Sequence, residues 1–182
     1  MIKLSKLNRE LKMALSMYEI SIPMFIHNFN ILSRILLKAE KDAEKRNIDK
    51  TVFLNARLAP DMMPLTKQIQ IGTDMVRLGI GRLSGVKAPS FKDNETTFSD
   101  LQKRIKKTIT FLKKIKSKQM DSSELKKIEL SIGKRKLVFK FKNGYIYLSE
   151  WIIPHFFFHM TTTYNILRAN GVNLGKRDFV KM

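Results

Sequence analysis

Length, composition and charge already narrow the classes of protein to which this chain can belong. Its 182 residues fit one domain, which at this size buries a hydrophobic core without needing disulfides or metals. Cysteine is absent, which excludes disulfides, thiolate nucleophiles and cysteine-based zinc sites, and a cytoplasmic, reducing compartment is expected. No run of roughly 18 uncharged apolar residues is present, so we expect a soluble protein without a membrane-spanning helix.

The first 16 residues are basic and carry leucines at helical spacing, at Leu4, Leu7, Leu11 and Leu15. They lack the continuous apolar core that a secretory signal requires. Two interpretations stay open: a basic amphipathic arm, or an extension produced by a start site assigned upstream of Met17. We therefore expect an N-terminal arm or extension over residues 1–16 and a single domain over residues 17–182.

The first long helix is predicted over residues 20–46, with Ser21 as its cap and Pro23 in its first turn. Its apolar residues recur every three or four positions and form one stripe: Ile22, Phe25, Phe29, Leu32, Leu36, Ala39 and Ala43. A second helix is predicted from Pro60 or Met62 to Leu83. Gly72 and Gly79 lie in its apolar stripe, which predicts that another element packs against it at close range.

A loop over residues 85–94 leads to a third helix predicted over residues 97–118, with Asn94 or Thr96 as its cap. The face of this helix opposite its apolar stripe is basic and is formed by Lys103, Arg104, Lys106, Lys107, Lys113, Lys114 and Lys116. Residues 101–142 hold 15 Lys or Arg against 3 acids, out of a net charge of +19 for the chain. Binding of a polyanion such as nucleic acid is one interpretation, and a solvated surface is the other. We favour the solvated surface, because Lys outnumbers Arg 25 to 10 and Arg reads phosphate better.

The apolar period changes from 3.6 to 2 in KIELSIGKRKLVFKF, which predicts a β-hairpin that turns at Gly133. The last helix is predicted over residues 145–169, with a kink at Pro154 and an end at Asn170-Gly171. These elements predict an all-α four-helix bundle with one β-hairpin between the third and fourth helices.

Four strings occur in the order NARLAPDM at 55–62, DNETTF at 93–98, FHMTTTYNILRANGV at 158–172 and LGKRDF at 174–179. Together they closely resemble the bacterial domain-of-unknown-function family nineteen ninety-three, within the DinB/YfiT-like superfamily. The resemblance covers about residues 17–180. It implies a DinB-like four-helix bundle over the domain and implies no activity, since the family has none assigned.

His155 and His159 are four residues apart on one face of the last helix, a spacing that lets two imidazoles share a metal. The resemblance to DinB-like enzymes implies such a pair together with a histidine on the second helix. The second helix has no histidine here; its inward candidates are Asp61, Gln68 and Gln70, and His27 lies on the first helix beyond the apolar stripe. We therefore expect no metal and no other cofactor, and we expect His159 to be a buried, hydrogen-bonded structural residue.

Two further polar stretches of the sequence are candidates for a role in a site. Asp61 is predicted in the first turn of the second helix, where Arg57 pairs with it. Thr161, Thr162 and Thr163 either line a polar pocket or bond back to carbonyls one turn earlier. No Ser-His-Asp order, phosphate loop or dinucleotide fingerprint is present, so no reaction can be assigned.

The leading hypothesis for function is a small molecule bound between helices, with Asp61, Gln68, His159 and Tyr164 as pocket candidates. One alternative is non-catalytic polyanion binding through the basic face of residues 103–142. The other alternative is a structural or stress-related homodimer.

Overall fold

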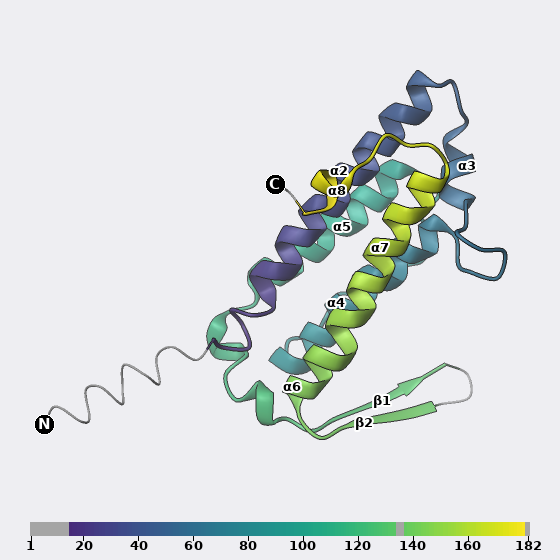
Figure 1. Ribbon diagram of the computed structural model, residues 1–182. Coiled ribbons are helices and arrows are strands. Elements are labelled where there is room, and N and C mark those ends of the chain that lie inside the picture. Colours follow the sequence, from purple (N-terminus) through teal and green to yellow (C-terminus); the bar gives the residue numbers. More distant parts are fainter. Residues whose placement is uncertain (1–14, 134–136, 181–182) are drawn as a thin grey trace, which may run out of the picture.

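The computed structural model describes residues 15–133 and 137–180, and within them four long helices run side by side (Figure 1). They are α2 (Ile22–Lys45), α4 (Leu65–Ser84), α5 (Phe98–Lys114) and α7 (Ile153–Ala169). α4 packs against both α7 and α5, and α2 packs mainly against α5. The predicted bundle is confirmed. The predicted arm over residues 1–16 falls outside the described residues except for Leu15 and Ser16.

Shorter elements connect the long helices. In chain order they are α3 (Lys50–Asn55), the 3-10 turns η1 (Ser117–Gln119) and η2 (Ser123–Leu125), the strands β1 (Ile128–Ile132) and β2 (Leu137–Phe141), α6 (Gly144–Ile146), the π-helical η3 (Tyr147–Ile152) and α8 (Lys176–Val180). None of the helices in the described part of the chain has both the length and the apolarity needed to cross a bilayer.

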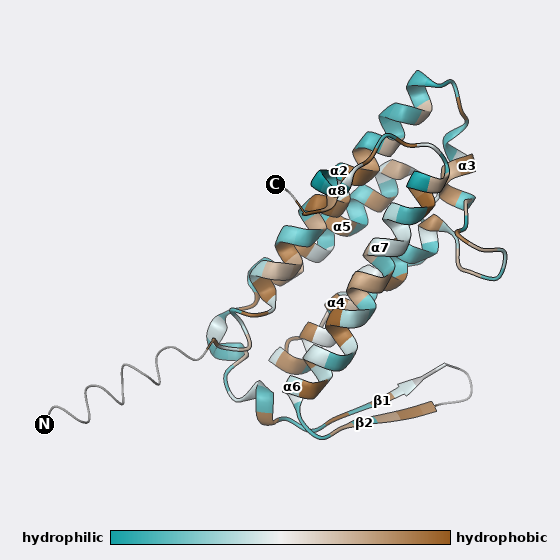
Figure 2. Cartoon of the chain, viewed as in Figure 1, coloured by the Kyte–Doolittle hydropathy of each residue, from teal (hydrophilic) through white to brown (hydrophobic). Residues whose placement is uncertain are grey.

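The apolar stripes meet inside the bundle, and polar residues cover its outer faces (Figure 2). Every residue predicted on the α2 stripe is buried. Phe25 and Phe29 each pack edge-on against Phe156 of α7, at ring-centroid distances of 5.3 and 5.0 Å. Such edge-to-face pairs add roughly 0.5–1.5 kcal/mol to the burial of the rings themselves.

The helix ends differ from the prediction at four places. Ser21 does not cap α2, because its hydroxyl donates to the carbonyl of Met17 instead. α4 begins at Leu65, after Pro64, because the residues before it form a turn closed by Met62 N–H and Ala59 O. The cap of α5 is Thr97, whose Oγ1 accepts from the backbone N–H of Asp100 at 3.1 Å, and this helix ends four residues earlier than predicted.

The close approach predicted for the α4 glycines is present, and the partner is the last helix. A Cβ added to Gly79 would lie 2.5 Å from Cδ1 of Ile152, and one added to Gly72 would lie 3.3 Å from Cβ of His159. Since residue 72 meets residue 159 and residue 79 meets residue 152, the two helices are antiparallel. The glycines therefore give up helix propensity for tight packing of α4 against α7.

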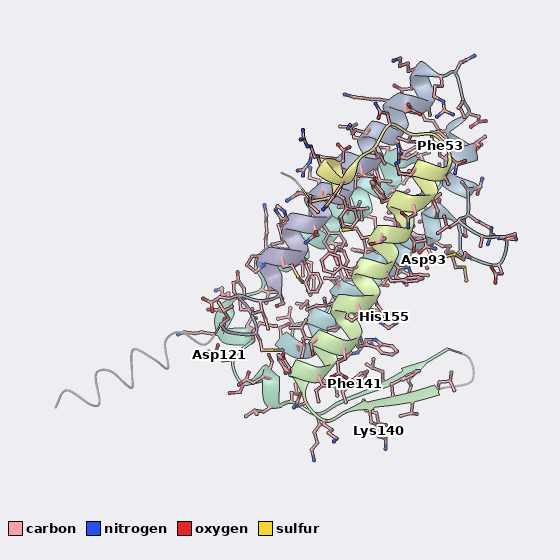
Figure 3. All side chains as sticks on the ribbon, in the orientation of Figure 1. Phe53, Asp93, Asp121, Lys140, Phe141 and His155 are labelled. Carbon is pink, nitrogen blue, oxygen red and sulfur yellow. The ribbon has the colours of Figure 1, made fainter. Side chains whose placement is uncertain are left out.

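The hairpin has the predicted strands, paired so that Leu130 lies opposite Phe139, and Gly133 turns with φ of 72°. Phe139 and Phe141 pack on Trp151 at ring-centroid distances of 4.8 and 5.5 Å, which fastens the hairpin to the base of the last helix (Figure 3). The inward alternation fails near the turn, where Leu137 is 59% exposed.

The last helix is irregular directly before Pro154, where a kink was predicted. Residues Tyr147–Ile152 are π-helical, and regular α7 begins at Ile153. Proline has no N–H to donate to the preceding turn, and the wider π turn accommodates that loss. The side chains of Tyr147 and Trp151 are carried by this irregular segment.

Candidate functional site

The four predicted pocket residues do not lie in one place. Gln68 and His159 meet between α4 and α7, with 2.7 Å between Gln68 Oε1 and His159 Nδ1. Asp61 is exposed in the turn before α4. Arg57 does not pair with Asp61 but donates to the carbonyl of Met62. Tyr164 packs against Phe179 of α8, at a ring-centroid distance of 5.7 Å. The structure therefore brings together two of the four.

The hydrogen bonds of Gln68 assign the tautomer of His159. The Gln68 Nε2 donates to the carbonyl of Met63 at 2.9 Å, so its Oε1 is the acceptor that faces the imidazole. His159 therefore carries its proton on Nδ1. Burial, and secondarily the charge of nearby His155, lower the pKa of His159 to about 4. The imidazole is neutral at physiological pH.

Two of the three threonines that follow His159 settle an alternative that the sequence left open. Thr162 and Thr163 donate to the carbonyls of Phe158 and His159, one turn earlier. Both side chains are buried. These two hydroxyls therefore donate to the backbone of their own helix rather than to a ligand.

A groove of about 350 Å³ lies between α4, the hairpin and η3. Its apolar wall consists of Ile71, Met75 and Leu78 from α4, Leu130 from β1 and Trp151 from η3. Trp151 is the single tryptophan of the chain. Its ring centroid lies 4.3 Å from that of His155, one turn further along the last helix.

Polar groups stand at both ends of this groove. Gln70 and Asp74 from α4, joined by Asp93, form one end, and Arg82 and Tyr147 form the other. Arg82 Nη1 donates to the hydroxyl of Tyr147 at 3.2 Å. Burial raises the pKa of Tyr147, so its hydroxyl stays protonated.

Sequence reasoning named Gln70 among the inward candidates but missed the rest of the groove. The signal was present as spacing: Asp74, Leu78 and Arg82 recur every four residues along α4. Tyr147, Trp151, His155 and His159 do the same along the last helix. Side chains four apart share a helix face, so two antiparallel helices with such rows present them to the same space.

Comparison with known proteins decides the family. The family described as "Domain of unknown function (DUF1993)" matches residues 17–180. The chain belongs to this family. The crystal structure of a DinB family member from Shewanella denitrificans is similar to it, with 35% identity over 90% of each chain and a TM-score of 0.82. No curated protein matches. The resemblance found in the sequence and the DinB-like bundle that it implied are confirmed.

The residues of this DUF1993 protein do not fit the metal site implied by the DinB resemblance. The α4 residue that reaches His159 is Gln68, an amide in place of a histidine. His155 Nδ1 lies 2.7 Å from the carbonyl of Trp151, which leaves Nε2 as the atom that could bind a metal, so the number of ligands decides the fit. Within residues 15–133 and 137–180, no group of three or more His, Cys, Asp or Glu is placed to hold an ion. Two imidazoles are too few ligands for a tight zinc or nickel site.

We predict that purified protein made without a histidine tag and dialysed against a chelator carries no stoichiometric transition metal. Elemental analysis by mass spectrometry measures this directly. About one zinc or nickel per chain would contradict the prediction and would make His155 and His159 ligands. Substituting His155 with alanine would then have to release the metal.

The lowered pKa of His159 predicts an acid-sensitive fold. Between pH 6.5 and about 4 the unfolded chain binds a proton that folded His159 refuses, so stability falls as the pH is lowered through this window. One pKa unit corresponds to about 1.4 kcal/mol, so the loss is of the order of 3 kcal/mol by pH 4.

Urea titrations at pH 7, 6, 5 and 4 measure this loss. His159→Asn keeps a donor towards Gln68 and cannot titrate, so its stability is expected to fall less than that of the wild type over the same range. His27→Asn, at an exposed histidine of α2, is the matched control and should follow the wild type. Equal pH dependence in wild type and His159→Asn would contradict the prediction.

Arg104 corrects the predicted basic face of the third helix. Its side chain is 1% exposed and contacts three carboxylates: Asp74 at 2.6 Å, Glu95 at 2.9 Å and Asp93 at 3.0 Å. Its Nε also donates to Thr73 Oγ1 at 2.7 Å. The basic face therefore consists of lysines, and this arginine belongs to the interior.

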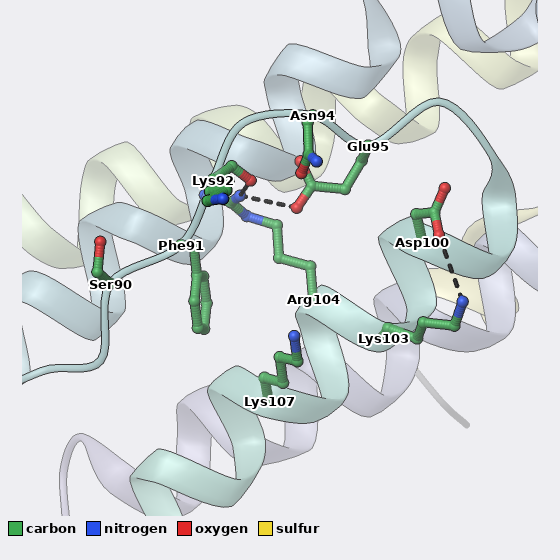
Figure 4. Close-up of a pocket in the computed structure, with 9 residues that line it drawn as sticks. All are labelled: Ser90, Phe91, Lys92, Asn94, Glu95, Asp100, Lys103, Arg104 and Lys107. Atoms are coloured by element: carbon green, nitrogen blue, oxygen red, sulfur yellow. Dashed lines mark hydrogen bonds and ion pairs between the residues drawn. The ribbon is translucent and has the colours of Figure 1, made fainter.

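The Arg104 cluster fastens the loop before α5 to α4. Phe91 of that loop contacts two guanidiniums, with its ring centroid 4.4 Å from Cζ of Arg77 and 5.1 Å from Cζ of Arg104. Figure 4 shows Arg104 reaching from α5 towards Glu95 and Lys92 of the loop, beside a pocket that Lys103 and Lys107 also line. The same cluster positions Asp74 and Asp93, which form one end of the groove.

Proposed function

We propose that the groove between α4, the hairpin and η3 binds a small organic molecule. The observation that carries this proposal is the combination of an apolar wall with polar groups at both ends, in a volume of about 350 Å³. Ligand sites are typically concave and mostly apolar, with a few polar groups that fix orientation, and they begin at about 300 Å³. A cytoplasmic location fits the absence of cysteine. No reaction is assigned.

The polar atoms left for a ligand differ between the groove and the space between the predicted candidates. Gln68 is bonded at both ends of its amide and His159 at Nδ1, so His159 Nε2 is the one polar side-chain atom of this pair left for a ligand in the described structure. Gln70, by contrast, is 2% exposed, lines the groove and has an Oε1 without a partner among the described residues. A buried acceptor left unpaired costs about 1–3 kcal/mol. Because this Oε1 is itself buried, a ligand in the groove would have to displace neighbouring side chains to reach it.

Trp151 makes the proposal directly testable, because the only tryptophan of the chain lines the groove. A fragment collection is screened by the intrinsic fluorescence of the protein, and saturable changes are expected. Leu78→Arg places a long charged side chain at the groove wall, where Leu78 is 37% exposed, and should abolish those changes. Leu37→Arg is the matched control, since Leu37 is 46% exposed on α2 and does not line the groove.

Saturable fluorescence changes that survive Leu78→Arg would place the ligand elsewhere and overturn the proposal. The absence of any saturable fragment at millimolar concentration would overturn it as well. Both variants are compared with the wild type by thermal unfolding, so that a loss of binding is not a loss of fold.

The lysines of α5 predict weak binding of nucleic acid. Lys106, Lys107 and Lys113 are exposed, but Arg104 is engaged inside, and the nearby Phe98 and Phe111 are buried and cannot stack on bases. Binding to duplex DNA should therefore be sequence-independent, with a Kd of about 10⁻⁴–10⁻⁶ M that weakens steeply with salt. Nanomolar binding that persists at about 150 mM salt would contradict this. A homodimer also stays a prediction.

A further inference from the structure

The two ends of the groove differ in chemistry, and the difference specifies a class of ligand. This step rests on the proposed function, because it concerns the same groove. One end offers hydrogen-bond acceptors without donors, and the other offers donors. A net charge of +19 over the whole chain would by itself favour anions, so any selection of a cationic group has to come from the groove itself.

The acceptor end consists of Gln70, Asp74 and Asp93. The Gln70 Nε2 donates to Glu95 Oε2 at 2.7 Å, which fixes the amide so that Oε1 remains the orphan. Asp74 Oδ1 accepts from both Arg77 and Arg104, at 2.7 and 2.6 Å, while no described residue donates to Oδ2. The Gln70 Oε1 is buried, so the group that can meet a ligand at this end is the Asp74 carboxylate, which is 30% exposed. Its Oδ2 fits an ammonium group, which carries three donors and no acceptor.

The donor end consists of Arg82 and Tyr147. The Tyr147 hydroxyl accepts from Arg82, stays protonated, and donates to no described residue. Tyr147 is 0% exposed, so its hydroxyl orients Arg82 and does not itself meet a ligand in the groove. A guanidinium fits a carboxylate, because two of its N–H groups can donate to the two oxygens. Arg82 is exposed, so an incoming anion reaches it from solvent.

The distance between the ends sets the length of the ligand. Asp74 and Arg82 are eight residues apart on α4, which corresponds to about 12 Å along the helix. Leu78 and Trp151 line the groove between them. We infer that the groove binds an elongated zwitterion, with an amine at Asp74, a carboxylate at Arg82 and an apolar body between them.

Three matched probes test the inference by Trp151 fluorescence at low salt. The first is a benzene ring with an aminomethyl group and, para to it, a propanoate; the others replace either the amine or the carboxylate with a methyl group. We expect the zwitterion to bind at least about tenfold more tightly than either analogue, since hydrogen bonds to charged groups contribute about 1.5–3 kcal/mol.

Two variants assign the ends. Arg82→Gln, at an exposed position, should reduce binding of the zwitterion to the level of the amine-only probe and leave that probe unchanged. Asp74→Asn should weaken the two amine probes and leave the carboxylate-only probe unchanged, which also shows that the groove is intact. If Asp74→Asn does not fold, the Arg82→Gln result decides alone.

These experiments distinguish failure of the zwitterion inference from failure of the proposed groove. Two results would overturn the zwitterion and leave the proposed groove standing. One is equal affinity for the three probes, and the other is that no probe binds while other fragments bind in a Leu78-dependent way. No Leu78-dependent binding by any compound overturns both.

Discussion

Arg104→Met is expected to destabilise the fold by about 3 kcal/mol or more. Breaking a buried ion pair by removing one partner costs about 3–5 kcal/mol, because it leaves uncompensated charge in the interior. Glu95 is 10% exposed and would lose its principal partner, whereas Asp74 and Asp93 are 30% and 47% exposed and regain water. This places the expected loss at the lower end of the range. Urea unfolding at pH 7 measures it.

Matched controls separate this effect from a general loss of positive charge. Lys103→Met and Lys107→Met flank Arg104 on the same helix, and both lysines are exposed, so each should change stability by about 0.5 kcal/mol or less. Adding Glu95→Gln to Arg104→Met removes the most buried orphaned carboxylate and should recover part of the stability. An Arg104→Met protein as stable as the lysine controls would show that the cluster contributes nothing.

The bundle could be predicted because its helices are amphipathic and the period of their apolar residues reports directly which face is buried. The α2 stripe and the α4 glycines show this well: each residue was placed correctly from spacing alone. Helix ends were less predictable, because Ser21 and Thr97 both have capping side chains and only the local backbone decides which of them caps.

The candidate site was less predictable because it depends on contacts between distant segments. Arg104 occurs in a run of lysines, so sequence pattern assigned it to their exposed face, yet its three carboxylate partners come from α4 and the loop before α5. Gln68 was predicted correctly as facing inward, but its partnership with His159 spans 91 residues. Asp61 was predicted in the first turn of α4, but this helix begins only at Leu65, so Asp61 lies in the turn before it.

The groove depends on one glycine that joins the hairpin to the last helix. Gly144 begins α6, and a Cβ added there would lie 1.9 Å from the carbonyl oxygen of Ser123 and 2.8 Å from Cδ2 of Leu83. The carbonyl belongs to the backbone of η2 and has no rotamer with which to move away. Relief would therefore have to come from a shift of η2 or of α6 itself.

Gly144→Ala is therefore expected to destabilise the fold by about 3 kcal/mol, at the upper end of the usual range for overpacking. Since η3 follows α6 directly, the same shift should move Trp151 and change its fluorescence emission in the folded state. Gly175→Ala is the matched control, because a Cβ at Gly175 meets no atom within 4 Å. Thermal unfolding and emission spectra of both variants decide the matter: a Gly144→Ala protein with the stability and the spectrum of the control would show that this contact is not tight.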